Sequence, residues 1–290
     1  MTLREIESQP ALWGKAAGVA AEVRARLPQP GQRVAIIGCG TSYYIAQAVA
    51  GIRESHGIGE TDAFVASEMP STRHYDLVVA ISRSGTTTEV VRALDALSAG
   101  TPSLAISAVP GTPVVETAGD AVLLEFADES SIVQTRFATT VLALLREHLG
   151  DDVGPAIADT EAGLSQPLPV EPSEFEHFAF LGRGWSVGLA FEAALKFREA
   201  GGAWAESYPA MEYRHGPISV AGPSTLVWFL AGADEDLVAA VRSTGASVHE
   251  GRGDPMAELV TLQRAAVALA QFRGLDPDQP QHLTRSVVLP

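Results

Sequence analysis

Five hydroxyl side chains surround one glycine between an apolar run at 76–82 and a helical pattern at 87–99. In an open parallel sheet, ligands bind where the strands end, and N–H groups at the start of a helix favour negative charge. Gly85 lets the backbone approach a ligand closely, and Arg83 can add a positive charge. The stretch predicts a phosphate site, or alternatively an ordinary helix N-cap with surplus hydroxyls. The hydroxyls belong to Ser82, Ser84, Thr86, Thr87 and Thr88.

A second turn of glycines and hydroxyls, GCGTSYY at 38–44, follows an earlier apolar run. It lacks the third glycine of the dinucleotide-binding pattern, and the chain has no Walker pattern GxxxxGK[ST], so a nucleotide-binding domain is not favoured. Thr41 and Ser42 can serve a ligand, or one of them can be the N-cap of the next helix. Cys39 lies where the turn needs a small residue, and we do not expect it to act as a nucleophile.

Three charged residues recur at helical spacing within FEAALKFREAGG. Glu192, Lys196 and Glu199 stand at i, i+4 and i+7 and therefore share one face of a helix. Apolar residues flank that face, which is unusual for a solvated stripe. The pattern is consistent with a site for acid–base chemistry, or with an ordinary surface Glu–Lys pair.

One histidine follows this helix in the Pro-punctuated stretch WAESYPAMEYRHGPISV at 204–220. His215 is held in a His-Gly-Pro turn, and the ordinary pKa of histidine suits proton transfer. The alternative is a structural loop histidine. No second His or Cys stands nearby at ligand spacing, so the sequence predicts no metal site.

Short apolar runs alternate with helical patterns through most of the chain, which predicts an α/β fold with parallel sheets covered on both faces. One or two polar helices are expected in 1–31, a first domain in 32–150, a linker with at most one short helix in 151–176, and a second domain in 177–290. The expected strands are 33–38, 76–82, 103–109, 121–126, 177–182, 225–232 and 246–252; long helices are expected at 131–150 and 257–274.

The second domain begins as a repeat of the first, because residues 34–49 overlay 178–193 without a gap at an offset of 144. Gly38 then matches Gly182, and Gly40 matches Gly184. This predicts two homologous halves. Where the first half has its hydroxyl stretch, the second has AGADEDLVAAVRS, which is acidic. We therefore expect one anion site per chain.

The composition limits the partners. The formal net charge of −15 and the pI of about 4.8 argue against a nucleic-acid partner. The single cysteine excludes an internal disulfide, and no apolar run reaches the length of a membrane span. The start of the chain lacks the apolar core of a signal peptide. The expectation is a cytoplasmic protein.

Several motifs in one order resemble the double sugar-isomerase (SIS) domain family. The chain is most similar to the isomerase half of glucosamine-6-phosphate synthase and to amino-sugar-6-phosphate deaminases and ketose–aldose isomerases. The resemblance covers essentially the whole chain. The motifs that carry it are GCGTSYY, ISRSGTTTE, FLGRG with EAALKFRE, AESYPAMEYRHGP and DPDQPQHLTRSVVL.

The resemblance implies two three-layer αβα domains, each with a five-stranded parallel sheet, and a homodimer that binds a hexose 6-phosphate. It implies that Glu199 moves a proton between C1 and C2 and that His215 opens the sugar ring across a dimer interface. It implies no metal or organic cofactor. The remaining implied site residues are Ser82, Ser84 and Thr87 with the backbone of Arg83 for the phosphate, Thr41 and Ser42 for the sugar, and Glu192 and Lys196 as supporting residues.

Three departures distinguish the chain from the synthase. It has no glutaminase domain, so we do not expect it to make ammonia from glutamine. Arg285 stands where the synthase has a lysine for the sugar carbonyl, and an arginine forms no ordinary Schiff base. Arg83 replaces a glutamine of the synthase, as in the deaminase-like relatives. These changes favour a deaminase, an isomerase or a deglycase; the rival interpretation is a non-catalytic sugar-phosphate sensor.

Overall fold

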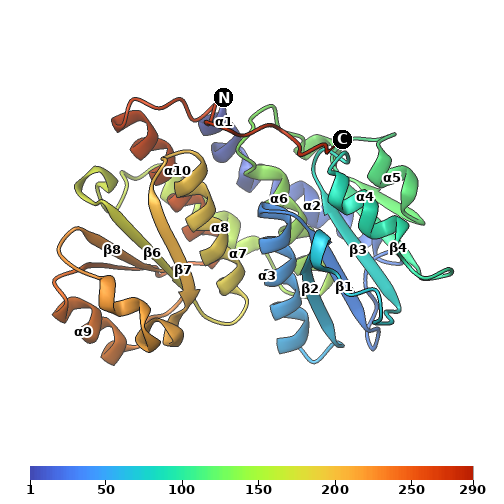
Figure 1. Ribbon diagram of the computed structural model, residues 1–290, viewed down its shortest axis with the longest axis horizontal. Coiled ribbons are helices and arrows are strands. Elements are labelled where there is room, and N and C mark those ends of the chain that lie inside the picture. Colours follow the sequence, from blue (N-terminus) through green and yellow to red (C-terminus); the bar gives the residue numbers. More distant parts are fainter. Residues whose placement is uncertain (290) are drawn as a thin grey trace. The chain divides into compact units, whose positions relative to one another are not determined.

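The computed structural model describes residues 1–289, which form two compact units (Figure 1). The first-sheet unit holds residues 11–130, 134–153 and 284–289, and the second-sheet unit holds 1–10, 131–133 and 154–283. Each unit is built around one parallel sheet. Among the described residues, no helix has the length and apolarity that crossing a bilayer requires.

The first-sheet unit has a five-stranded parallel sheet in the order β2-β1-β3-β4-β5. From the central strands β1 and β3, the chain adds β2 on one side of the sheet and β4 and β5 on the other. Because the crossover connections are right-handed, the helices that follow the two directions cover opposite faces of the sheet. Helices α4 and α5 cover one face through Val90, Leu94 and Val114, and α3 packs with α6. The strands are Val34–Gly38, Thr61–Val65, Leu77–Ser82, Ser103–Ser107 and Asp120–Leu123; helices α2 to α6 are Gln9–Val23, Thr41–Ser55, Thr88–Asp95, Pro113–Thr117 and Arg136–His148.

The second-sheet unit has a four-stranded parallel sheet in the order β7-β6-β8-β9. Helix α9 covers one face with Leu237, Val238 and Val241, while α8 packs with α10, which also contacts α7. Strands β6 to β9 are His177–Gly182, Trp204–Pro209, Thr225–Phe229 and Ser247–Glu250. Helices α1, α7, α8, α9 and α10 are Thr2–Glu7, Gly154–Leu164, Ser186–Glu199, Glu235–Ser243 and Pro255–Phe272.

The strand–turn–helix repeat that the sequence predicts is present in both units. Gly40 and Gly184 take nearly the same left-handed conformation, with φ of 53° and 52°. A Cβ on Gly38 would lie 2.8 Å from Ser42, and one on Gly182 would lie 2.4 Å from Ser186. Both glycines therefore allow the same close approach of strand and helix.

Five predictions from the sequence need correction. The described residues form four strands in the second sheet, not five, because after β9 the chain enters α10, and the later apolar run 287–289 belongs to the first-sheet unit. The edge strands β2 and β7 were missed, since their residues mix polar and apolar types. The helix expected over 131–150 begins at Arg136. The short helix expected in 151–176 is α7, eleven residues long. The N-terminal helices are not polar throughout, since Ile6 and Trp13 are buried.

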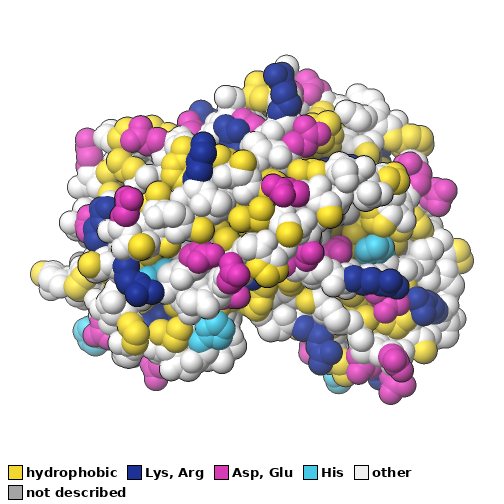
Figure 2. Space-filling view, turned by 180° about the vertical axis from the view of Figure 1, so that it is seen from behind, with side chains coloured by type: hydrophobic (Ala, Val, Ile, Leu, Met, Phe, Trp, Pro, Cys, Tyr) yellow, Lys and Arg dark blue, Asp and Glu magenta, His cyan; other side chains and the backbone are white. Residues whose placement is uncertain are grey.

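On the face shown in Figure 2, lysine and arginine side chains do not gather into a basic patch. Lysine and arginine side chains lie scattered there among acidic ones. A nucleic-acid interface needs clustered positive charge. This face therefore offers no such interface.

Candidate functional site

The hydroxyl loop, residues 82–88, lies where the strand order of the first sheet changes direction. It follows β3, and the turn before α3 follows the neighbouring parallel strand β1. Carboxyl ends of adjacent parallel strands at such a switch point form the usual ligand crevice of a doubly wound sheet. Thr41 and Ser42 begin α3 and are each 4% exposed. The N-cap position is Gly40, so the alternative in which Thr41 or Ser42 caps this helix is wrong.

Hydrogen bonds inside the loop bring its hydroxyl groups together. The N–H of Gly85 donates to Ser82 Oγ at 3.2 Å, and the N–H of Thr86 donates to Ser84 Oγ at 3.3 Å. Ser82 Oγ lies 3.5 Å from Thr87 Oγ1. Thr87 occupies the N-cap position of α4, but its side chain makes no capping hydrogen bond. The Thr87 side chain therefore does not cap α4, and the hydroxyls of the loop gather on one short turn.

Gly85 is required by this conformation. Its φ is +66°, and its carbonyl accepts a hydrogen bond from the N–H of Val114 at 2.9 Å. A Cβ placed on Gly85 would lie 1.9 Å from Thr112 Oγ1 and 2.7 Å from Thr112 Cβ. Both the backbone conformation and the space exclude a side chain.

We expect Gly85→Ala to lower the free energy of unfolding by about 2–4 kcal/mol, from left-handed strain together with overpacking. Gly100→Ala is the matched control, because Gly100 has φ of +85° but nothing within 4 Å of its Cβ position. That control isolates the conformational part, about 1–2 kcal/mol. Urea unfolding of both variants measures the difference; equal losses would refute the steric part.

The Arg83 side chain is buried and its charge is balanced within the first-sheet unit. Its side chain is 4% exposed, and Nη1 lies 3.8 Å from Oε1 of Glu129, which is fully buried. Nη2 donates to the backbone carbonyl of Arg285 at 2.8 Å. Burying a guanidinium without a partner is costly, so Glu129 makes this position possible. The positive charge of Arg83 is thus shared with a carboxylate instead of standing alone at the loop.

Glu129 is a polar residue that the sequence did not single out. Its carboxylate accepts the N–H groups of Thr135, Arg136 and Phe137 at 2.7, 3.1 and 3.2 Å. These are the orphan donors at the start of α6. The signal was available, because an acidic residue in a polar run precedes a long apolar helix.

Arg285 lies in the first-sheet unit as well. Its Nη2 lies 2.5 Å from Oδ1 of Asp128, and its side chain is 41% exposed. Residue 128 directly precedes Glu129, so Arg83 and Arg285 both pair with the same short acidic stretch.

Cys39 is a protonated thiol rather than a nucleophile. Burial and the nearby charge of Glu89 raise its pKa to about 11. The thiolate is the reactive form. The expectation that Cys39 is not a nucleophile is therefore supported.

Alkylation of native protein by iodoacetamide at pH 8 is expected to be about 100-fold slower than alkylation of the urea-unfolded chain, since the thiolate fraction falls tenfold per pH unit below the pKa. The rate should still be rising with pH above pH 9. Mass spectrometry of the alkylated protein over time measures both rates. A native rate that levels off near pH 8 would contradict the raised pKa.

The charged face of α8 is buried in the second-sheet unit. Lys196 Nζ lies 2.5 Å from Oε2 of Glu199 and 3.3 Å from Oε1 of Glu192. The side chains of Lys196 and Glu192 are 2% and 1% exposed, whereas that of Glu199 is 20% exposed. The alternative of an ordinary surface Glu–Lys pair is therefore wrong. The lysine holds two carboxylates, and only the outer one reaches open space.

Glu199 lines a cavity of about 540 Å³. The cavity lies between the end of α8 and the segment 274–283 of the same unit. Polar neighbours on its wall include Arg198, Asp276 and His282. His282 has φ of +62°, an uncommon conformation for a residue other than glycine. A carboxylate oriented by a buried ammonium at the wall of a cavity is a suitable general base.

His215 does not line this cavity. It ends the 3-10 turn η4, Ala210–His215, and is exposed. Within the described residues of one chain, the structure therefore does not bring His215 to Glu199. Its predicted role in ring opening stays a prediction.

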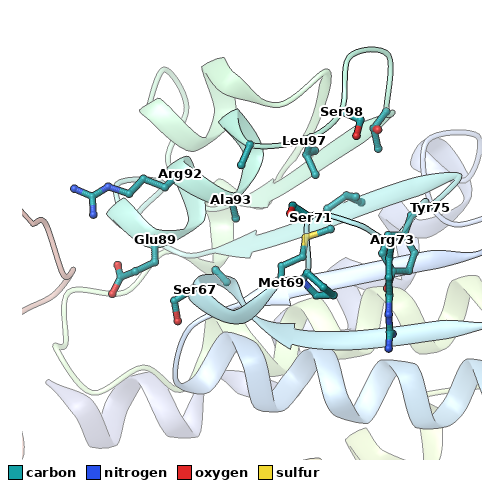
Figure 3. Close-up of a pocket in the computed structure, with 15 residues that line it drawn as sticks. Ser67, Met69, Ser71, Arg73, Tyr75, Glu89, Arg92, Ala93, Leu97 and Ser98 are labelled. Atoms are coloured by element: carbon teal, nitrogen blue, oxygen red, sulfur yellow. The ribbon is translucent and has the colours of Figure 1, made fainter.

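A second cavity, of about 340 Å³, lies in the first-sheet unit between α4 and residues 66–75 (Figure 3). Met69 and Leu97 give it an apolar wall, and none of the predicted site residues lines it. Arg73 at one end is held by Asp62 at 3.0 Å. None of the residues 82–88 of the hydroxyl loop lines this cavity.

Comparisons with known proteins find similarity along the chain. Residues 29–146 match the family model of the SIS domain. The glutamine–fructose-6-phosphate aminotransferase [isomerizing] of Sulfurisphaera tokodaii is 28% identical over 89% of this chain and 50% of its own length. That of Bacillus spizizenii is 26% identical over 99% of this chain and 58% of its own length. The chain thus spans about half the length of these curated relatives.

Two solved structures share the fold over nearly the whole chain. Glucosamine-6-phosphate deaminase from Thermotoga maritima superposes with a TM-score of 0.86 and 26% identity, covering 99% of each chain. Tagatose-6-phosphate ketose/aldose isomerase from Escherichia coli superposes with a TM-score of 0.84 and 19% identity, covering all of this chain and 96% of the other. The matched SIS model includes the hydroxyl loop and the whole first sheet.

Proposed function

We propose that this chain is a phosphosugar isomerase or deaminase that acts on a hexose 6-phosphate or an amino-sugar 6-phosphate. The observation that carries the proposal is its similarity to the Thermotoga maritima deaminase over 99% of both chains. The hydroxyl loop and the Lys196–Glu199 pair support it, because they supply the two functions the reaction needs: neutral donors for a phosphate and a positioned carboxylate.

In this proposal Ser82, Ser84 and Thr87 bind the 6-phosphate, together with the backbone at Arg83. Neutral hydroxyls and N–H groups at a helix start suit a phosphate monoester. Thr41 and Ser42, at the end of the neighbouring strand, contact the sugar.

Glu199 is the proposed base. It takes the proton from one of the carbons C1 and C2 and returns it to the other through an enediol or an enolamine. Lys196 orients Glu199, and Glu192 holds Lys196. His215 is proposed to assist ring opening in a homodimer, and no cofactor takes part in these steps. The second-sheet unit is proposed to be a second SIS domain.

Deamination or isomerisation suits this chain better than sugar amination. The resemblance to the synthase puts Arg285 in the place of its lysine, and Arg285 pairs with Asp128. A guanidinium stays protonated and forms no ordinary Schiff base, but it can polarise a carbonyl or hold an anion.

A panel of hexose 6-phosphates and their 2-amino derivatives tests the proposal. Ammonia release and ketose formation are followed for each, with binding measured by calorimetry. We expect turnover of at least one member, and ammonia release if the substrate is an amino sugar. Binding of several members without turnover of any would establish the non-catalytic sensor instead.

A further inference from the structure

The C-terminal segment 284–289 docks on the hydroxyl loop within the first-sheet unit. The N–H of Thr88, the first residue of α4, donates to the carbonyl of Val287 at 3.2 Å. The N–H of Leu289 donates to Thr88 Oγ1 at 2.9 Å. Figure 1 shows the end of the chain beside α4. These bonds fix the register of the segment against the loop.

Ser286 lies among the loop hydroxyls in this register. Its Oγ lies 3.0 Å from Ser84 Oγ and 2.9 Å from Thr86 Oγ1. A hydroxyl group can both donate and accept, so Ser286 can pass a hydrogen bond from the loop to an anion. The hydroxyl cluster at this turn therefore includes a residue from the far end of the chain.

Arg83 holds the peptide that precedes Ser286. Its Nη2 donates to the Arg285 carbonyl at 2.8 Å, and its Nη1 lies 3.8 Å from Oε1 of Glu129. Glu129 is itself fixed by the N–H groups at the start of α6. One buried ion pair thus connects three parts of the unit: the loop, the start of α6 and the C-terminal segment.

We propose that Arg83 and Glu129 are positioning residues and that Ser286 is a further phosphate-binding residue. The Arg83 side chain does not contact the phosphate. It holds the Arg285–Ser286 peptide so that the Ser286 hydroxyl completes the donor set of Ser84 and Thr87. This inference rests on the proposed function, because it concerns the same phosphate.

Arg83→Gln tests the inference, since glutamine keeps a polar group but loses the charge and the reach to Arg285. We expect hydrogen exchange of the amides of Thr88 and Leu289, whose N–H groups hold the segment on the loop, to accelerate about tenfold or more, as a charge-assisted bond is lost, while α10 exchanges as in wild type. Affinity for glucosamine 6-phosphate should fall about tenfold. Ser286→Ala should weaken binding about five-fold and leave the segment docked. Ser243→Ala, on an exposed helix end, is the control.

The outcomes separate this inference from the proposed function. If the wild-type protein binds glucosamine 6-phosphate and Arg83→Gln binds it equally well, the inference is wrong and the proposed function stands. This holds whether or not hydrogen exchange in the C-terminal segment changes. If Arg83→Gln does not fold, Ser286→Ala decides, and unchanged affinity overturns the inference. A wild-type chain that binds neither glucosamine 6-phosphate nor inorganic phosphate contradicts the proposed function, and the phosphate role of Ser286 falls with it.

Discussion

Glu199→Gln is expected to lower turnover by about 10²- to 10⁴-fold, the usual contribution of a positioned general base. Glutamine has nearly the shape of glutamate, but it cannot accept the substrate proton. Glu199 is the carboxylate of the charged face that lines the cavity, and Lys196 holds it at 2.5 Å. Binding of a phosphorylated sugar should stay within about threefold, because the phosphate donors lie on the hydroxyl loop.

Steady-state kinetics and calorimetry on the same preparation separate the two effects. The control is Glu235→Gln, an exposed acid in the first turn of α9, which should leave turnover unchanged. Wild-type turnover in Glu199→Gln would remove this residue from the mechanism. A large loss of affinity instead of turnover would make it a binding residue.

Lys196→Met is expected to destabilise the protein by about 3–5 kcal/mol, because it removes one partner from a buried charge cluster. The side chain of Lys196 is 2% exposed, and its loss leaves the buried Glu192 and the neighbouring Glu199 without their cation. Methionine fills similar volume, so the loss reports the charge rather than a cavity. Turnover should fall as well, since Glu199 is no longer oriented.

The chain offers a direct control, because Lys15 is its only other lysine. Lys15 is exposed and lies 6.0 Å from the ring of Phe126. Lys15→Met should cost at most about 1 kcal/mol. The double variant Lys196→Met/Glu192→Gln should have a free energy of unfolding about 1 kcal/mol or more above that of Lys196→Met alone. The reason is that the buried charge of Glu192 is removed together with its partner. Urea unfolding measures all three, and equal losses for both lysines would contradict the buried-cluster account.

Local features could be predicted from the sequence. The hydroxyl loop connects a strand to a helix that directly follows it in the chain, so the sequence shows all three parts together. The offset of 144 residues between the two glycine turns is also visible in the sequence. The helical face of Glu192, Lys196 and Glu199 follows from spacing alone. The burial of this face does not follow from the spacing, because the apolar residues beside it are compatible with an exposed face and with a buried one.

Features that depend on distant partners could not be predicted. The place of Arg83 depends on Glu129 and on the carbonyl of Arg285, neither of which its own neighbourhood indicates. The edge strands β2 and β7 lack the continuous apolar pattern of strands with two neighbours. The fifth strand expected in the second sheet came from a resemblance, and the second sheet has four strands among the described residues.

The proposed function requires that Glu199 moves a proton at C1 and C2 of a bound sugar phosphate. The most direct measurement uses glucosamine 6-phosphate labelled with deuterium at C2 and follows the label by NMR. We expect that wild-type protein removes the label from C2, to C1 of a ketose product or to water, and that Glu199→Gln does not. A label that stays on C2 while the sugar binds, or one that Glu199→Gln removes at the wild-type rate, would contradict the account.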